Sequence, residues 1–249
     1  MDAHSYLDRI SYTGPTDPSA EVLKSLHRAH MFAVPFENLE IKLGRKIICD
    51  EASILCKIVQ QRRGGFCYEL NGAFAALLRE LGFKVTLLSA RVARQDGNYG
   101  PEFDHLTLRV DLDEPWLADV GFGDSFVDPL KLKVDLEQPQ GRRNFRIIEE
   151  SGSLHMEMAE PGEEWKRQYT FTLVPRHLSD FSGMCHYHQT SPQSSFTQKS
   201  ICSKATPAGR ITIADQKLII TRDGQREEST LGSDEEWRAA LQKRFGIVL

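Results

Sequence analysis

A cysteine, a histidine and an aspartate stand in three separate stretches where they could act together. Cys67 follows two glycines in "RRGGFCYELNGAF" and precedes an apolar periodic run, so we expect it in the first turn of a helix. The unpaired N–H groups and the positive dipole end at that place stabilise an anion. We therefore expect a nucleophilic thiol with a lowered pKa. The alternative is a small buried apolar side chain, which is the usual fate of a free cysteine.

The histidine and the aspartate lie in "FDHLTLRVDLDEPWLADVGFG", which is predicted to form two antiparallel strands. Asp119 is a carboxylate in an apolar strand, where it needs a partner. A turn of odd length centred on Asp113 places Asp119 opposite Thr107, and there it lies diagonal to His105 and within reach of it. A turn of even length would place Asp119 on the other face of the sheet. We predict the odd register.

The order cysteine, histidine, aspartate is that of papain-like and transglutaminase-like nucleophiles. In those sites the cysteine begins a helix and the other two residues come from neighbouring strands. Such a triad supports acyl transfer through a thioester. The spacing does not choose between hydrolysis, amide exchange and acetyl transfer.

Three kinds of secondary structure must position these residues. Helices are predicted over the first third of the chain, where Asp17 and Asp50 cap two of them and Gly82 ends the third, which begins near the cysteine. Beyond Gly82 the apolar residues alternate, which indicates an antiparallel sheet or small barrel. The final segment mixes short strands with a helix that Ser233 caps.

The predicted fold class is α+β, in three parts. Residues 1–83 form a helical bundle that carries the nucleophile. Residues 84–185 form a central antiparallel β-barrel that carries the histidine and the aspartate. Residues 186–249 form an α/β lid.

Composition and charge exclude several classes of function. The 249 residues carry a net charge of −4 and show no basic stripe, which argues against nucleic-acid binding. We also expect no membrane helix and no signal peptide, because no long apolar run and no basic start followed by an apolar stretch occur. The five cysteines are an odd number without a CxxC pair, which predicts reduced thiols in the cytoplasm.

The cluster "CHYH", which holds Cys185, His186 and His188, is a candidate metal site. Adjacent and i,i+2 ligands without a partner cluster make a poor tetrahedral site. We therefore expect no metal.

Five stretches resemble, in order, the signature stretches of the arylamine N-acetyltransferases. They are "VPFENLEI", "RRGGFCYELNG", "DHLTLRV", "WLADVGFGDSFVDPL" and "YHQTSPQSSFTQKSICSKATPAGRITI", and together they span most of the chain. The resemblance implies a helical bundle, a β-barrel and an α/β lid. It also implies a ping-pong reaction in which Cys67 takes an acetyl group from acetyl-CoA and passes it to an arylamine, a hydrazine or an arylhydroxylamine. His105 would hold the thiolate and relay protons, and Asp119 would orient His105.

The stretch "GFGDSF" matches the family's short loop beside the nucleophile, which implies contact with both the acyl carrier and the acceptor. We expect Gly121, Gly123 and Ser125 to bind CoA, since two glycines expose backbone N–H groups to a phosphate or an acyl oxygen. Asp124 departs from this expectation because it adds a negative charge beside an anionic donor. Arg210 could meet a CoA phosphate, or it could belong to a solvated basic face.

Three phenylalanines are expected to contact the acceptor. Phe122 belongs to the same loop, and Phe36 and Phe196 match positions that line the family's aryl pocket, with simple core packing as the alternative for these two. The expected partners are small-molecule arylamines or hydrazines, with no nucleic acid and no membrane. The chain would act as a monomer or a homodimer.

Three other interpretations stay open from the sequence. A thiol hydrolase or transglutaminase-like enzyme would use the same triad. An amide synthase of the same superfamily would take a polyketide acyl chain from a carrier. A binding protein on this scaffold would be catalytically silent, which the intact triad disfavours.

Overall fold

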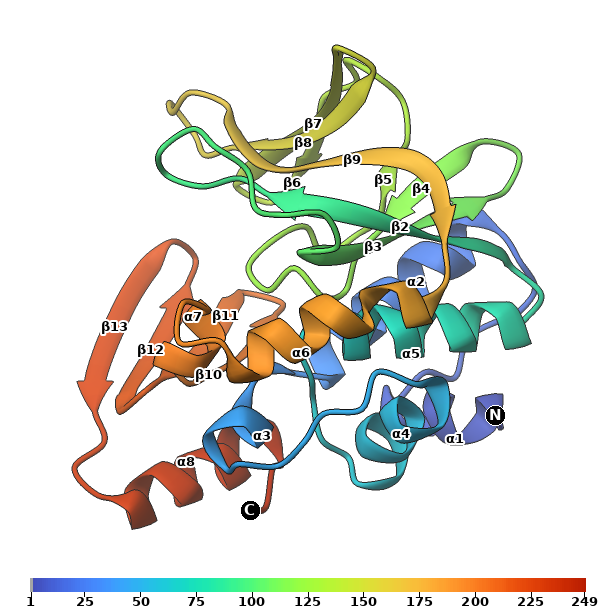
Figure 1. Cartoon of the computed structure of the whole chain (residues 1–249). Helices are drawn as coiled ribbons and strands as arrows, with labels where there is room; N and C mark the ends of the chain where they lie inside the picture. Colours follow the sequence, from blue (N-terminus) through green and yellow to red (C-terminus); the bar gives the residue numbers. More distant parts are fainter. Residues whose placement is uncertain (1) are drawn as a thin grey trace.

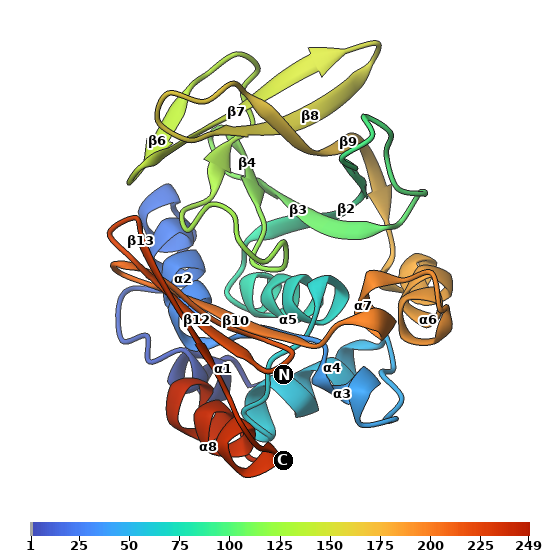
Figure 2. The ribbon, with the colours of Figure 1, turned by 90° about the vertical axis from the view of Figure 1, so that its left-hand side faces the viewer.

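The computed structural model describes residues 2–249 and has an α+β architecture. Helices α2 and α5 lie beneath an antiparallel barrel, and a second sheet stands to one side of them (Figure 1; Figure 2). The helices are α1 (Ala3–Arg9), α2 (Ala20–Ala33), α3 (Leu39–Lys42), α4 (Glu51–Leu55), α5 (Cys67–Glu80), α6 (Ser182–Thr190), α7 (Ser195–Gln198) and α8 (Asp234–Phe245). A π-helical turn, η1 (Cys56–Gln60), continues α4, and a 3₁₀ turn, η2 (Leu178–Phe181), precedes α6.

The helix ends follow local capping rules, with one correction. Ser19, and not Asp17, caps α2: its side chain accepts a hydrogen bond from the Val22 N–H at 3.2 Å. The prediction of Asp17 was wrong because Ser19 itself is still extended, so the helix begins at Ala20, two residues later than Pro18. The other predictions are confirmed: Asp50 and Ser233 cap α4 and α8, and Gly82 follows α5 with a φ of +89°.

Helix α5 is buried on almost every face, so its start is fixed from all sides. Gly64 is required just before it, because a Cβ there would lie 2.0 Å from the Pro35 carbonyl oxygen. Buried ion pairs hold the same region: Lys57 contacts Glu69 at 2.7 Å, and Arg63 contacts Glu37 at 2.8 Å. Removing one partner of such a pair is costly, because it leaves an uncompensated buried charge.

The barrel is an eight-stranded antiparallel sheet in the order β5-β4-β3-β2-β9-β8-β7-β6. Its strands are β2 (Lys84–Val92), β3 (His105–Asp111), β4 (Pro115–Ala118), β5 (Leu130–Lys131), β6 (Gln138–Gln140), β7 (Arg143–Glu150), β8 (Ser153–Ala159) and β9 (Lys166–Arg176). The Gln138 side chain spans the two edge strands, since it accepts from the Lys131 N–H at 2.7 Å and donates to the Lys131 carbonyl at 3.1 Å. These bonds nearly close the barrel.

The second sheet has the order β1-β10-β11-β12-β13. Its strands are β1 (Phe36–Glu37), β10 (Ile201–Thr206), β11 (Gly209–Ala214), β12 (Lys217–Arg222) and β13 (Gln225–Thr230). Strand β1 comes from the N-terminal region and pairs Phe36 with Ser203, so this sheet is anchored beside the helices. Helix α8 buries Trp237, Leu241 and Phe245 in a core that it shares with Ile213.

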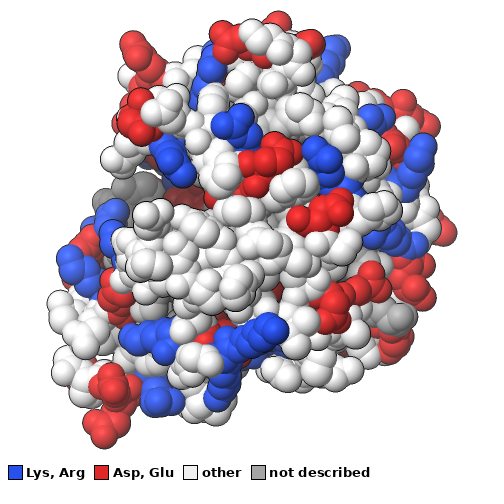
Figure 3. Space-filling model, in the orientation of Figure 1, with Lys and Arg blue, Asp and Glu red and all other residues white. Residues whose placement is uncertain are grey.

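Charged side chains of both signs are scattered over the face seen in Figure 3, among broad uncharged areas. Within residues 2–249, no helix has the length and apolar character needed to cross a membrane.

Candidate active site

Cys67 is the first residue of α5 and is 4% exposed. Its position at the helix N-terminus is the one predicted. The predicted lowering of the thiol pKa is wrong. Burial raises the pKa of Cys67 well above its usual value, and the charges of Asp119 and Asp104 raise it further. A backbone hydrogen bond with Leu106 opposes this change only in part. The thiol therefore needs a base to accept its proton, because the dipole of the helix does not by itself make it a thiolate.

The candidate base, His105, lies on β3. His105 Nε2 is 2.6 Å from Asp119 Oδ2, and both side chains are almost fully buried. The pairing of β3 with β4 sets Asp111 opposite Pro115 and Leu108 opposite Ala118, so the turn is centred on Asp113 and the predicted odd register is confirmed. Because Nε2 of His105 is hydrogen-bonded to Asp119, the other ring nitrogen, Nδ1, is left for proton exchange with a nucleophile.

Asn71 connects this pair to the helix of Cys67. It lies four residues after the cysteine, which is about one helical turn. Its Nδ2 donates to Asp119 Oδ1 at 2.8 Å and to the Leu106 carbonyl at 2.6 Å. Its Oδ1 accepts from the Val120 N–H at 2.9 Å. One amide therefore holds the N-terminal turn of α5 against both strands of the hairpin.

Asp119 stays ionised in spite of its burial. Burial opposes its charge most strongly, but the attraction and hydrogen bond of His105, with the bonds from Asn71 and Gly121, keep its pKa below the usual value. Its backbone N–H donates to His27 Nε2 at 3.1 Å. His27 Nδ1 lies 2.6 Å from the Val127 carbonyl, so a single buried ring on α2 contacts both ends of the loop from 119 to 127.

Gly121 and Gly123 in that loop are glycines for different structural reasons. A Cβ on Gly121 would lie 2.9 Å from Cys67 Cα and 2.7 Å from Asn71 Nδ2, so the loop backbone packs directly against Cys67 there. Gly123 has a φ of +88° and open space around it. Ser125 is 7% exposed, and its hydroxyl has no hydrogen-bond partner among the described residues.

Asp124 is not an isolated charge. Arg143 of β7 donates to both of its carboxylate oxygens, at 2.7 and 3.1 Å, and Arg210 Nε of β11 donates to it at 3.0 Å. The hydrogen bonds and the positive charges of these two arginines keep the pKa of Asp124 below its usual value. The carboxylate thus ties the barrel to the second sheet. Arg210, which is 11% exposed, does not belong to a solvated basic face.

The three predicted phenylalanines lie in two groups. The Phe122 ring is 5.1 Å from the His105 ring and 5.0 Å from the Tyr169 ring. Phe36 and Phe196 are 6.1 Å apart, and Phe196 also contacts Phe66, the residue before Cys67, at 5.8 Å. Both groups are therefore next to a triad residue.

The candidate metal cluster is dispersed. Cys185 is buried and accepts from Gln189, His186 is exposed, and His188 Nδ1 bonds to Ser194 Oγ at 3.1 Å. Among residues 2–249, no group of three or more histidine, cysteine, aspartate and glutamate side chains is arranged to hold a metal ion.

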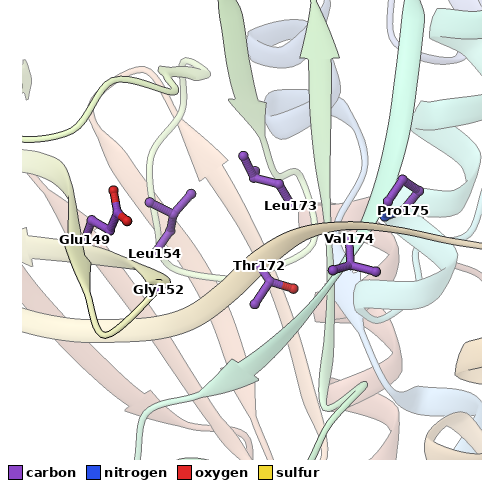
Figure 4. Close-up of a pocket in the computed structure, with 7 residues that line it drawn as sticks. All are labelled: Glu149, Gly152, Leu154, Thr172, Leu173, Val174 and Pro175. Carbon is purple, nitrogen blue, oxygen red and sulfur yellow. The ribbon is translucent and has the colours of Figure 1, made fainter.

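A surface hollow of about 580 Å³ lies on the barrel, and Figure 4 shows the residues that line it. Its lining comes from the β7–β8 turn and from β9: Glu149, Gly152, Leu154, Thr172, Leu173, Val174 and Pro175. None of Cys67, His105 and Asp119 borders it.

Sequence reasoning missed Asn71 and His27. Both are polar residues within apolar helix faces, and that anomaly is the signal that could have identified them. It also missed Tyr169, whose ring lies 5.3 Å from that of His105. Tyr169 stands in an ordinary alternating strand, and no sequence signal marks it.

Known proteins agree with this arrangement. A family model described as N-acetyltransferase matches residues 19–249. The chain is 35% identical to the arylamine N-acetyltransferase, pineal gland isozyme NAT-3, of Gallus gallus, an alignment that covers 100% of this chain and 95% of that protein. It is 34% identical to an arylamine N-acetyltransferase / N-hydroxyarylamine O-acetyltransferase of Salmonella typhimurium, over 98% of this chain and 88% of the relative. It is also 28% identical to a proansamycin X synthase of Amycolatopsis mediterranei, over 98% and 96% of the two chains.

The fold agrees equally well with solved structures. The arylamine N-acetyltransferase of Mycobacterium marinum in complex with CoA superposes with a TM-score of 0.91 at 32% identity, over 99% of this chain and 93% of that one. The family model and the full-length relatives establish the family that the five sequence stretches resemble. This chain is a member of the arylamine N-acetyltransferase family.

Proposed function

We propose that this enzyme moves an acetyl group from acetyl-CoA to the nitrogen of an arylamine, a hydrazine or an arylhydroxylamine by way of a thioester on Cys67. The observation that carries the proposal is the docking of α5 against the His105–Asp119 pair through Asn71. It supports the proposal because it ties the helix that begins at the buried Cys67 to the hairpin that carries His105 and Asp119. Such a triad could support hydrolysis, amide exchange or acetyl transfer. Membership of the arylamine N-acetyltransferase family favours acetyl transfer.

In the first half-reaction, His105 Nδ1 takes the proton of Cys67 as the sulfur attacks the acetyl carbonyl. The carbon–sulfur bond to CoA breaks, and the CoA thiolate receives that proton as it leaves. Asp119 stabilises the imidazolium that exists between the two transfers. The raised pKa of Cys67 makes this transfer necessary, since the buried thiol does not ionise alone at neutral pH.

In the second half-reaction, the acceptor nitrogen attacks the thioester carbonyl. His105 takes a proton from that nitrogen, the carbon–sulfur bond to Cys67 breaks, and the proton returns to the sulfur. The acetylated amine leaves with the new carbon–nitrogen bond. Donor and acceptor thus use the same small site in turn, which is the condition for ping-pong kinetics.

The loop after Asp119 is proposed to receive the donor. Gly121 brings backbone against the nucleophile, and the unpartnered Ser125 hydroxyl is available to a ligand after a small movement of the loop. Gly123 supplies the left-handed turn between them. Phe122, Phe36 and Phe196 would contact the aryl ring of the acceptor, because they are next to His105 and Phe66.

The cellular compartment and the oligomeric state are also part of the proposal. The five cysteines are free thiols, which suits a cytoplasmic enzyme in a reducing compartment. We infer that it acts as a monomer or a homodimer on small molecules. The division into a helical bundle (residues 1–83), a β-barrel (84–185) and an α/β lid (186–249) is retained as a proposal for the domain organisation.

Steady-state kinetics test the proposal. Acetyl-CoA and aniline would be varied together, with the acetylated amine measured as product. Parallel double-reciprocal lines are expected, together with complete loss of product in Cys67→Ala. Intersecting lines, or product from Cys67→Ala at a rate near that of the unmodified enzyme, would contradict the mechanism.

A second function is an amide synthase that closes a polyketide amide, and the similarity to a proansamycin X synthase favours it. That chemistry uses the same triad with a different acyl donor. Free acetyl-CoA separates the two functions: an acetyltransferase is acylated by it within a turnover, and a carrier-dependent synthase is not.

A further inference from the structure

A buried histidine of α2 holds both ends of the loop that begins at Asp119. The backbone N–H of Asp119 donates to His27 Nε2 at 3.1 Å, and His27 Nδ1 lies 2.6 Å from the Val127 carbonyl oxygen. His27 is fully buried, and Asp119 is 1% exposed. One ring therefore bonds to two backbone groups that stand at opposite ends of the loop, far from α2 in the sequence.

These two contacts require a single state of the ring. Nε2 accepts from an N–H and so carries no proton, whereas Nδ1 carries the proton that it donates to the Val127 carbonyl. Burial favours this neutral state, because it lowers the pKa of His27 to about 4. At neutral pH the ring thus offers one fixed acceptor to Asp119 and one fixed donor to Val127.

Asp119 is held through its side chain and through its backbone by different elements. Its carboxylate bonds to His105 of β3 at 2.6 Å and to Asn71 of α5 at 2.8 Å. Its backbone N–H bonds to His27 of α2. A buried N–H without an acceptor is costly, so loss of His27 would favour a shift of the Asp119 backbone. Such a shift would carry the carboxylate away from His105.

The His27 ring is also packed between the loop and the helix that begins at Cys67. Phe126, near the end of the loop, stacks on the ring with 5.8 Å between centroids and 21° between planes. Phe74 of α5 meets the ring edge-on at 5.7 Å. Phe74 follows Cys67 by about two helical turns, so both lie on one side of α5. His27 therefore contacts both parts of the protein that the triad joins.

We propose that His27 is a positioning residue for the triad, and that its Nε2 sets the place at which the Asp119 carboxylate meets His105. It touches none of the reacting atoms. Its role rests on the proposed function of Cys67 as the nucleophile, because Asp119 must stay aligned with His105 Nε2 for Nδ1 to exchange protons with the thiol.

Three variants separate the two bonds of the ring. His27→Leu removes both. The amide of His27→Asn reaches the place of Nδ1 and bonds only to Val127, whereas the longer amide of His27→Gln reaches the place of Nε2 and restores an acceptor for Asp119. With acetyl-CoA and aniline, we expect kcat to fall by about tenfold to 100-fold in His27→Leu and His27→Asn, and by no more than about threefold in His27→Gln.

His30→Leu is the matched control. His30 lies one turn further along α2, is fully buried, and also meets Phe74 edge-on, at 5.4 Å. Its Nδ1 lies 2.9 Å from the Tyr6 hydroxyl of α1, so the change removes a buried ring and a hydrogen bond away from the loop. We expect lower stability, measured by thermal unfolding, with kcat within about twofold of the unmodified enzyme. If His27→Leu does not fold, the comparison of His27→Asn with His27→Gln carries the test.

The proton between His105 Nε2 and Asp119 Oδ2 gives a readout that needs no acetyl donor. In a bond of 2.6 Å its ¹H NMR resonance is expected far downfield of the backbone amides. It should keep its position in His27→Gln and His30→Leu. In His27→Asn it should move upfield or vanish through exchange, because the bond lengthens as Asp119 shifts. A general loss of stability would not produce this order among the variants.

Two results would overturn the proposal. One is an equal kcat in His27→Asn and His27→Gln. The other is a His105 proton resonance in His27→Asn that superimposes on that of the unmodified enzyme. Full turnover in Cys67→Ala, with the expected changes in the resonance, would count against the proposed function alone. An acetyl group on Cys67 with an unchanged resonance would count against the role of His27 alone.

Discussion

Asn71 Nδ2 donates a 2.8 Å hydrogen bond to Asp119 Oδ1, and this bond joins the helix that begins at Cys67 to the strand end that carries Asp119. The same amide also contacts the Leu106 carbonyl and the Val120 N–H. Three bonds from one buried side chain therefore set the distance between Cys67 and the His105–Asp119 pair.

Replacement of Asn71 by alanine tests whether this side chain positions Cys67 relative to the His105–Asp119 pair. Loss of its three bonds frees Asp119 and the hairpin to shift, and a displacement of about 1 Å is enough for a loss of about 10²-fold in kcat. The measurement is kcat and KM for acetyl-CoA and aniline. Asn144→Ala is the matched control, because it removes another amide-to-carboxylate bond of 2.8 Å, to Glu137, on the barrel surface. An Asn71→Ala enzyme with unchanged kcat would contradict this role.

Gly121→Ala should be among the most damaging single-methyl changes in the chain. The added Cβ would lie 2.9 Å from Cys67 Cα and 3.0 Å from the Cys67 carbonyl oxygen, and backbone cannot move aside as a side chain can. We expect a loss of about 10²-fold in kcat from the displaced nucleophile.

Gly141→Ala provides the comparison for Gly121. Gly141 has a φ of +61° in open space, so alanine there costs about 1 kcal/mol of stability through backbone strain alone. Unfolding in urea and kcat would be measured for both variants. Equal effects of the two on kcat would show that the close contact at Gly121 is unimportant.

Asp124→Asn should alter donor affinity more than turnover. The change removes the negative charge that Arg143 and Arg210 share and makes the loop beside Cys67 more positive. We expect KM for acetyl-CoA to fall by about threefold at low salt, with the gain lost at high salt, because the freed arginines attract the phosphates and salt screens them.

Glu160→Gln is the control for Asp124→Asn. It removes the negative charge of the other carboxylate that pairs with Arg143, at 3.2 Å, and leaves the link between barrel and second sheet in place. A rise in KM for Asp124→Asn would show instead that the link itself shapes the donor site.

His27 should make the protein less stable in mild acid. Burial lowers the pKa of His27 to about 4, whereas an unfolded histidine binds its proton near pH 6.5. Between these values the unfolded state binds more protons than the folded state, so this contribution is complete above about pH 6.5 and falls as the pH decreases toward 4. The full effect is about 3 kcal/mol.

Urea unfolding at pH 7.5 and pH 4.5 measures this contribution. In His27→Gln the difference in stability between the two pH values should shrink by about 2 kcal/mol. A difference remains, because burial also lowers the pKa of His30. His186→Gln, at an exposed position, should keep the full difference. An unchanged pH dependence in His27→Gln would show that His27 is not held neutral by burial.

Much of the triad could be predicted from the sequence because its geometry is local. The register of β3 and β4 follows from the length of one turn, and that length places Asp119 beside His105. The start of α5 at Cys67 follows from glycines and from apolar periodicity. The lowered pKa of Cys67 was a wrong prediction, because burial depends on how the barrel covers the helix and no local pattern reveals it.

Contacts between distant segments could not be predicted. Asp124 is explained only by arginines from β7 and β11, which lie 19 and 86 residues away along the chain. His188 meets Asp104 across two elements that share no sequence pattern. The cap of α2 was misplaced for a simpler reason: Asp17 and Ser19 are both good caps, and local propensity does not choose between them.

The central claim is that Cys67 carries the acetyl group, and the intact mass of the enzyme tests it most directly. The enzyme would be mixed with acetyl-CoA in the absence of an amine, quenched rapidly in acid, and mapped by peptide mass spectrometry. We expect a gain of one acetyl group on Cys67, absent from Cys67→Ala and lost on addition of aniline as acetylated aniline forms. Formation of acetylated aniline at the full rate without any label on Cys67 would contradict the account.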